Sequence, residues 1–253
     1  MFTKLRLGNS GSPRRWLALA LGGLASAGLL LSVGATSPTR TPSAMATISR
    51  VPSADAPLSE WQDWAAAQRS VMTASGWGKS LGSKLGSDCT VTDLQVMPVV
   101  SDGHHGIPAG IVTNAVGGSV RCADQPATDG GSTTFGGSSA ATSSDCPVQD
   151  AGTSKAIADG VLCVGTYTYQ GDPNFIAASY KNTSSVSPYG QVDLGVGGCP
   201  GYSDGRYPAG GPGYISPGDT WFVAWGPRNF SNEWSSTWYE NGTTSWGSVC
   251  AEY

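Results

Sequence analysis

The chain has 253 residues, of which 36 are glycine and 16 are proline, and its formal net charge is −4. Five of the 14 basic residues and none of the 18 acidic residues precede Thr47, so a chain that begins there carries nine basic and eighteen acidic residues. Such an acidic surface repels phosphate backbones and anionic lipids, which argues against nucleic-acid binding and against binding to anionic membranes.

Residues 1–46 are predicted to be an export signal. A basic start containing Arg14 and Arg15 precedes the apolar run WLALALGGLASAGLLLSVGA, and AMA at 44–46 offers small residues for cleavage before Thr47. A membrane anchor is the alternative, but the apolar run is short and rich in glycine. The two arginines match a twin-arginine signal only in part, so both Sec and twin-arginine export stay open. We expect a secreted, extracellular protein that leaves the membrane once the signal is removed.

Residues 47–58 (TISRVPSADAPL) are predicted to form an extended N-terminal arm, because their prolines disfavour both helix and strand. Such an arm can lie in a groove of a partner protein. Its candidate partner contacts are Ile48, Val51, Pro52 and Pro57. The alternative is a frayed chain end without a role, which is the more common outcome for termini.

Residues 59–73 (SEWQDWAAAQRSVMT) form the one helix that the sequence predicts. Ser59 can cap its start, and the run of alanines favours helix. The side chains that fall near one face of this helix are those of Trp61, Trp64, Ala65, Gln68 and Met72. The glycines of residues 74–86 are expected to end the helix, so that 59–86 comprises a helix and a glycine-rich linker.

Six cysteines follow the signal, and an even number in an exported protein predicts three disulfides. They are Cys89, Cys122, Cys146, Cys163, Cys199 and Cys250. Six cysteines allow 15 pairings. Zinc binding is the competing interpretation, but no two cysteines have the C-x2-C spacing and the chain has only two histidines.

The loop SDGHHGIPAG, residues 101–110, holds both histidines and joins two strand-like runs rich in valine and threonine. Cys89 lies 16 residues before His105, and Cys122 lies 17 residues after it. Two antiparallel strands turning at His105 would therefore place these cysteines opposite each other. We predict a hairpin closed by a Cys89–Cys122 disulfide.

Residues 87–253 are predicted to form an all-β, disulfide-stapled sandwich or jelly-roll-like domain, preceded by the one N-terminal helix. Short strand-like runs alternate with turns rich in glycine and proline over this range. Long loops are expected at 123–160 and 197–219, because both stretches are poor in apolar residues or dense in glycine and proline. Cys146 and Cys163 are placed to close the far end of the first loop.

No catalytic residue, metal ligand or cofactor site is predicted. The chain lacks G-x-S-x-G and H-E-x-x-H, and a polar loop is a sufficient account of the adjacent His104 and His105. A glycosidase needs only two carboxylates, and no spacing selects a pair. The carboxylates available for such a pair are Asp193, Asp204, Asp219, Glu233 and Glu240.

Aromatic residues are dense near the C-terminus. On a strand, Trp221, Val223 and Trp225 would share one face, and Trp234 and Trp238 would share one if their segment is extended. Exposed rings would stack on sugars or anchor a protein, whereas buried rings would build the core, which we favour for a glycine-rich domain. Tyrosines in the Gly/Pro loop are better candidates for exposed contacts; they are Tyr202, Tyr207 and Tyr214.

The leading hypothesis is a secreted, non-catalytic binding or assembly module of bacterial origin. It would engage a protein partner through its N-terminal arm or a sheet edge, for example as an adaptor subunit of a secreted multi-protein or toxin particle. The alternative is a carbohydrate-binding module that uses the C-terminal Trp and Tyr residues. A secreted hydrolase and a protease inhibitor rank lower. The identity of the partner and the oligomeric state stay open.

Overall fold

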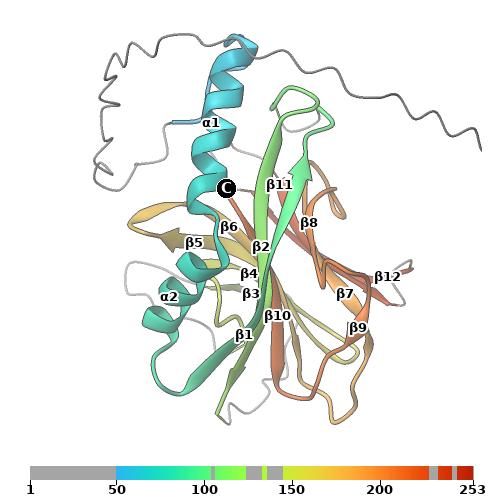
Figure 1. The fold of residues 1–253 in the computed structure, drawn as a ribbon. Coiled ribbons are helices and arrows are strands. Elements are labelled where there is room, and N and C mark those ends of the chain that lie inside the picture. The colour runs from blue at the N-terminus through green and yellow to red at the C-terminus, as the bar shows by residue number, and fades with distance from the viewer. Residues whose placement is uncertain are drawn as a thin grey trace, which may run out of the picture. The chain divides into compact units, whose positions relative to one another are not determined.

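The computed structural model describes residues 50–103, 106–123, 133–135, 145–227, 233–240 and 244–252. Its two helices and its strands belong to one compact unit (Figure 1). In chain order, the elements are α1 (Leu58–Val71), α2 (Ala74–Leu85), β1 (Cys89–Val100), β2 (Val112–Cys122), β3 (Thr133–Phe135), β4 (Ala151–Ile157), β5 (Gly160–Tyr169), β6 (Asp172–Asn182), β7 (Tyr189–Val196), β8 (Tyr202–Tyr207), β9 (Gly213–Tyr214), β10 (Asp219–Trp225), β11 (Glu233–Glu240) and β12 (Thr244–Glu252).

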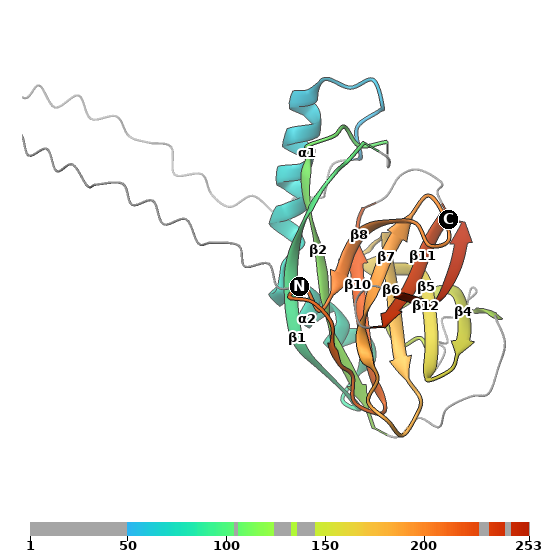
Figure 2. The same cartoon turned by 90° about the vertical axis from the view of Figure 1, so that its right-hand side faces the viewer.

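The strands pair antiparallel in two sheets, which confirms a mostly β fold. One sheet has the order β1-β2-β10-β6-β5-β4-β3, and the other has the order β12-β11-β7-β8 with β9 paired to β7. Figure 2 shows β1 and β2 at one end of the seven-stranded sheet, with α1 beside them. Side chains from both sheets meet in a single hydrophobic cluster.

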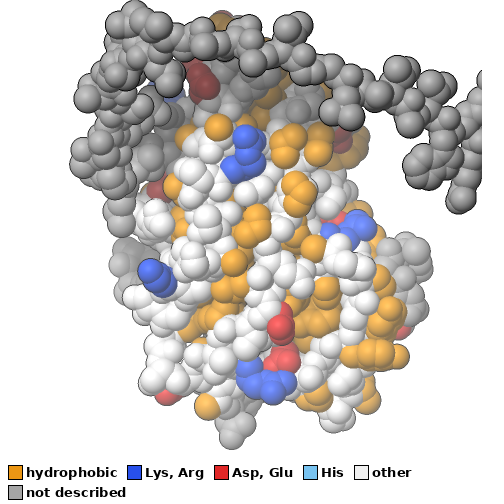
Figure 3. All heavy atoms as spheres, in the orientation of Figure 1, with side chains coloured by type: hydrophobic (Ala, Val, Ile, Leu, Met, Phe, Trp, Pro, Cys, Tyr) orange, Lys and Arg blue, Asp and Glu red, His pale blue; other side chains and the backbone are white. Residues whose placement is uncertain are grey.

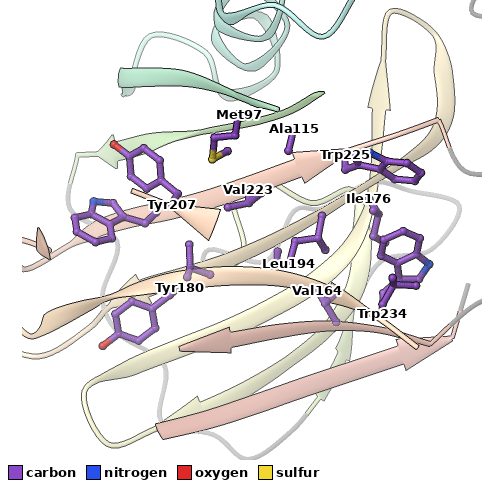
Figure 4. Packing of buried hydrophobic residues seen from close by; sticks show 14 of the residues in the cluster. Met97, Ala115, Val164, Ile176, Tyr180, Leu194, Tyr207, Val223, Trp225 and Trp234 are labelled. Carbon is purple, nitrogen blue, oxygen red and sulfur yellow. The ribbon is translucent and has the colours of Figure 1, made fainter. Parts of the chain in front are cut away.

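Alternation along β10 shows how the core is divided. Trp221, Val223 and Trp225 join the cluster that both sheets share, as their spacing predicts. Phe222 and Ala224 point to the other face, where α2 packs. Figure 4 shows Val223 and Trp225 among side chains of the shared cluster. Because side chains alternate along a strand, β10 contributes residues to both hydrophobic layers.

A second helix, α2, replaces the predicted glycine-rich linker. Trp77 and Leu81 are fully buried against the outer face of the seven-stranded sheet, and this burial offsets the low helix propensity of glycine. The Thr73 side chain caps the helix by accepting a hydrogen bond from the Gly76 N–H. Glycine at position 76 lets α2 pack close to the sheet, because a Cβ there would lie 2.2 Å from the Tyr169 hydroxyl.

Two expected loops contain strands. Residues 151–157 form β4, which pairs with β5, and the loop expected at 197–219 holds β8 and β9. The expectations for these segments are therefore wrong in part. β4 carries small and polar side chains, so its own hydropathy gives no strand signal. It is held by its pairing to β5, where a Cβ on Gly165 would lie 2.1 Å from the Ala151 carbonyl oxygen.

The N-terminal segment is not an open arm over its described part. Val51 is 4% exposed and belongs to the shared core, and Pro52 is also buried. Pro57 is exposed and stands at the N-cap of α1. Ile48 and the predicted signal lie outside the described residues. The core contact of Val51 corrects the prediction that this residue waits in solvent for a partner.

The three disulfides are Cys89–Cys122, Cys146–Cys163 and Cys199–Cys250. The first confirms the hairpin disulfide predicted from the spacing of its cysteines around the histidine loop. The second confirms the pairing of Cys146 with Cys163 that was predicted to close the far end of the 123–160 stretch. Three disulfides indicate an oxidising compartment. Within the described residues, neither helix is long and apolar enough to cross a membrane.

Removing the hairpin disulfide with the double variant Cys89→Ala/Cys122→Ala should lower the free energy of unfolding by about 2–4 kcal/mol. The register Cys89↔Cys122 joins the two ends of the hairpin, so the loss of the bond frees the whole hairpin in the unfolded chain. Urea unfolding of the oxidised protein measures the change. A variant as stable as the parent protein would contradict the assigned role.

Candidate binding site

Helix α1 closes one edge of the β1–β2 hairpin. β10 runs beside β2 only as far as the Val116↔Ala224 pair, which leaves the earlier part of β2 without a strand on that side. Gln68 fills this place: its Nε2 donates to the Asn114 carbonyl at 2.8 Å, and its Oε1 accepts from the Asn114 N–H at 2.9 Å. Arg69 donates to the Val112 carbonyl. The helix therefore satisfies backbone groups that a strand would otherwise bind.

The opposite edge of the hairpin has no such cover from a described strand. In the described part of the chain, β1 pairs with β2 alone. Pro98 stands opposite Asn114, whose N–H and C=O point to Gln68, so this is a non-hydrogen-bonded pair. The backbone groups of Pro98 must then point to the open side. Val96 and Val100 each lie two positions from Pro98 along the strand, so their backbone groups point to the same open side. Their two N–H groups are available there as hydrogen-bond donors.

Apolar side chains accompany the open backbone groups. Val96 is 42% exposed and Val100 is 64% exposed, and Pro98 between them is exposed too. Figure 3 shows a band of hydrophobic side chains over the β1–β2 hairpin. We call Val96, Pro98 and Val100 with their outward backbone groups the β1 edge.

The β1 strand itself carries no positive charge. Between Lys84 and Arg121 the chain has three aspartates, Asp88, Asp93 and Asp102, and no lysine or arginine. Exposed edge strands in natural proteins often carry lysine, which blocks pairing with other chains. The β1 edge lacks that protection.

Two features nevertheless restrict which strand can pair with β1. The register shifts between Thr92 and Gln95, and Asp93 within this bulge has a φ of 54°. Pro98 removes one outward donor without disturbing the ladder to β2. Bulges and prolines discourage indiscriminate pairing, so only a strand with a matching hydrogen-bond pattern could pair along the β1 edge.

A groove of about 510 Å³ lies below the β1 edge, at the other end of the hairpin. Its floor comes from β1, β2 and β10, and its wall comes from the β7–β9 side of the structure. The lining residues are Thr90, Thr92, Asp93, Ser119, Arg121, Tyr207, Tyr214, Ser216, Asp219 and Trp221. We call this hollow the tyrosine groove.

The alternation of β2 explains why the groove opens here. Val120 joins the outer hydrophobic layer under α2, so its neighbours Ser119 and Arg121 face the inner side. The register sets Ser119 between Thr92 and Trp221 on the adjacent strands. The inner face of the sheet is therefore polar at this end, and the hydrophobic packing between the sheets stops.

An ion pair crosses the floor of the groove. Arg121 donates to both carboxylate oxygens of Asp219, through Nη2 at 2.8 Å and through Nε. The two residues also stand opposite each other in the β2–β10 register. Exposed ion pairs contribute little to stability. This bidentate pair instead fixes the orientation of two planar polar groups at the surface.

The aromatic wall combines an exposed ring with buried ones. Tyr214 is 72% exposed, and its ring centroid lies 4.8 Å from that of Tyr189. Tyr207 is buried and meets Trp221 edge-on at 5.4 Å. Burial, together with the charge of Asp93, raises the pKa of Tyr207 to about 12, so its phenol is neutral at physiological pH.

Several predicted contact residues are placed elsewhere. Trp234 and Trp238 are buried in the shared core, which confirms the core interpretation and removes them from any contact surface. Tyr207 is also buried, contrary to the expectation of an exposed ring. Tyr202 is 50% exposed at the start of β8 and does not line the groove. Of the predicted tyrosines, Tyr214 alone is both exposed and part of the groove.

Two of the carboxylates weighed for a glycosidase pair, Asp193 and Asp219, are engaged in separate ion pairs. Asp193 and Asp219 belong to different sheets, and each carboxylate accepts hydrogen bonds from an arginine: Asp193 from Arg206 and Asp219 from Arg121. His104 and His105 lie outside the described residues. In the part of the chain that the structure covers, no three His, Cys, Asp or Glu side chains are grouped as a metal site needs.

Comparison with known proteins adds no relative: no family model, no curated protein and no solved structure matches the chain.

Proposed function

We propose that this protein is a secreted, non-catalytic binding module with a β-sandwich architecture, which takes up an extended segment of a partner protein along the β1 edge. In this role it would serve as an adaptor in a larger extracellular assembly. The observation that carries the proposal is the asymmetry of the hairpin. Gln68 and Arg69 close its β2 side, whereas its β1 side keeps outward backbone groups and exposed valines.

The β1 edge supports binding by strand addition. In this mode, main-chain hydrogen bonds supply affinity and alternating side chains supply selectivity. Val96 and Val100 point to one face of the sheet, so the added strand would present small apolar side chains beside them. A partner strand of alternating apolar residues meets these conditions.

The double variant Val96→Lys/Val100→Lys should abolish partner binding while the protein stays folded. Both positions are exposed, so the lysines add charge along the edge without disturbing the core. The C-terminally tagged protein is purified from the supernatant of the producing culture, and its size is measured. Proteins that co-purify with it in stoichiometric amounts are then identified. We expect the parent to be recovered with a partner and the variant to lose nearly all of it, because the two lysines oppose pairing along the edge.

Val186→Lys is the matched control, because Val186 is 56% exposed in the loop between β6 and β7. It should keep the partner. Recovery of the parent protein as a lone monomer would overturn the proposal. So would equal recovery of the partner by the double variant.

A further inference from the structure

We propose that the tyrosine groove is a binding site for a neutral saccharide. This activity is independent of strand addition at the β1 edge, because the groove occupies the opposite end of the hairpin and uses different side chains.

The lining of the groove favours a ligand that is rich in hydroxyl groups. Every one of the ten lining side chains carries a hydrogen-bonding atom, and none is aliphatic. An apolar peptide side chain would leave these polar groups without partners when it displaced their water. A sugar ring offers donors and acceptors around its rim and C–H groups on its faces, so it can satisfy the polar lining and contact the aromatic rings at once.

Tyr214 provides a fixed platform for one face of the sugar ring. Its backbone pairs with that of Tyr189, and the neighbouring pair is Gly213↔Gly190. The contact between the two tyrosine rings then restricts the orientation of the exposed ring. Because a tyrosine side chain has only two rotatable bonds and is already positioned, little conformational entropy is lost when a ligand packs against it.

The floor supplies directional hydrogen bonds. Arg121 has five N–H donors, and its pair with Asp219 uses only the Nε and one Nη2 donor, so others stay available at its exposed end. The hydroxyl groups of Thr92 and Ser119 lie beside this pair. Planar, fixed donors and acceptors are suited to pairs of vicinal sugar hydroxyl groups.

Charge selects a neutral ligand over an anionic one. The groove holds one arginine, which Asp219 neutralises, and a second carboxylate at Asp93. The surplus negative charge repels phosphate, sulfate and uronate groups. The phenol of Tyr207 adds no charge.

Affinity electrophoresis tests the site. The chain that begins at the predicted cleavage site, Thr47 to Tyr253, is run in native gels cast with dextran, xylan, mixed-linkage β-glucan, galactomannan or glycogen. A glycan array of neutral oligosaccharides is probed in parallel. We expect the parent to be retarded by at least one polymer. Tyr214→Ala should reduce the retardation at least fivefold, and Asp219→Asn should also weaken it with little change in melting temperature.

Tyr202→Ala is the matched control, since it also removes an exposed tyrosine ring, but outside the groove. It should migrate like the parent. Val96→Lys/Val100→Lys should also keep its retardation, so failure at one site is distinguishable from failure at the other. Absence of binding to every polymer and to the array, or equal retardation of Tyr214→Ala and the parent, would overturn the proposal.

Discussion

Replacement of Trp77 by alanine is expected to lower the free energy of unfolding by about 3–5 kcal/mol, the usual cost of truncating a large buried aromatic residue. Trp77 is fully buried between α2 and the seven-stranded sheet. Its ring stacks on Tyr167 and Tyr169, with centroid distances of 4.6 and 4.9 Å. The truncation removes all of these contacts and leaves a cavity that the sheet cannot fill.

Guanidinium unfolding followed by tryptophan fluorescence and far-ultraviolet circular dichroism measures this effect. Trp77→Phe keeps a ring in the stack and should cost less than half as much. Ser75→Ala, at an exposed position of the same helix, should change stability by no more than about 0.5 kcal/mol. A Trp77→Ala variant within 1 kcal/mol of the parent would show that α2 is not anchored by this residue.

Replacement of Gln68 by glutamate is expected to cost about 3 kcal/mol or more at pH 7, because it leaves a buried charge and unsatisfied acceptors. The carboxylate could still accept from the Asn114 N–H. It could not donate to the carbonyl oxygens of Asn114 and Gly226, which Nε2 binds at 2.8 and 3.0 Å. Both oxygens would instead face a negative charge.

The cost of Gln68→Glu should depend on pH. Burial and the facing carbonyl oxygens raise the pKa of the introduced carboxyl above that of the unfolded chain, so the folded state binds the proton more tightly. Stability relative to the parent should therefore recover as the pH falls through that raised pKa, where the protonated group regains a donor. Gln62→Glu, exposed on the same helix, is the control and should show no such recovery. A stability difference between Gln68→Glu and the parent that does not change with pH would contradict the role of Gln68 in binding the Asn114 backbone at the edge of β2.

Those parts of the fold that depend on local spacing could be predicted from the sequence. Trp221, Val223 and Trp225 are spaced two residues apart, which predicts that they share one face of a strand. Cys89 and Cys122 lie at nearly equal distances from the histidine loop, which predicts their disulfide. Both inferences need only the geometry of one strand or one hairpin.

Features that depend on distant partners were not predictable in this way. The glycines of α2 indicate a linker when read locally, but packing of Trp77 and Leu81 on the sheet makes that segment a helix. The β4 strand is stabilised by a neighbour that its own sequence does not reveal. In both places tertiary contacts decide the structure over local propensity.

The two proposed binding surfaces illustrate the same limit. Gln68 falls on the predicted inward face of its helix, but its partners Asn114 and Gly226 are 46 and 158 residues away. The pairing of Arg121 with Asp219 likewise depends on the order of β2 and β10 in the sheet. The sequence does show that β1 itself lacks positive charge, since no lysine or arginine lies between Lys84 and Arg121.

Residue-resolved amide exchange of β1 tests strand addition most directly. It is measured by NMR on the labelled protein, alone and in the complex recovered from the culture supernatant. Val96 and Val100 should exchange fast alone and slowly in the complex, because their outward N–H groups gain acceptors. Met97 and Val99, which face β2 in the register, should be protected in both states. Unchanged exchange at Val96 and Val100 in a complex that contains the partner would contradict binding at the β1 edge.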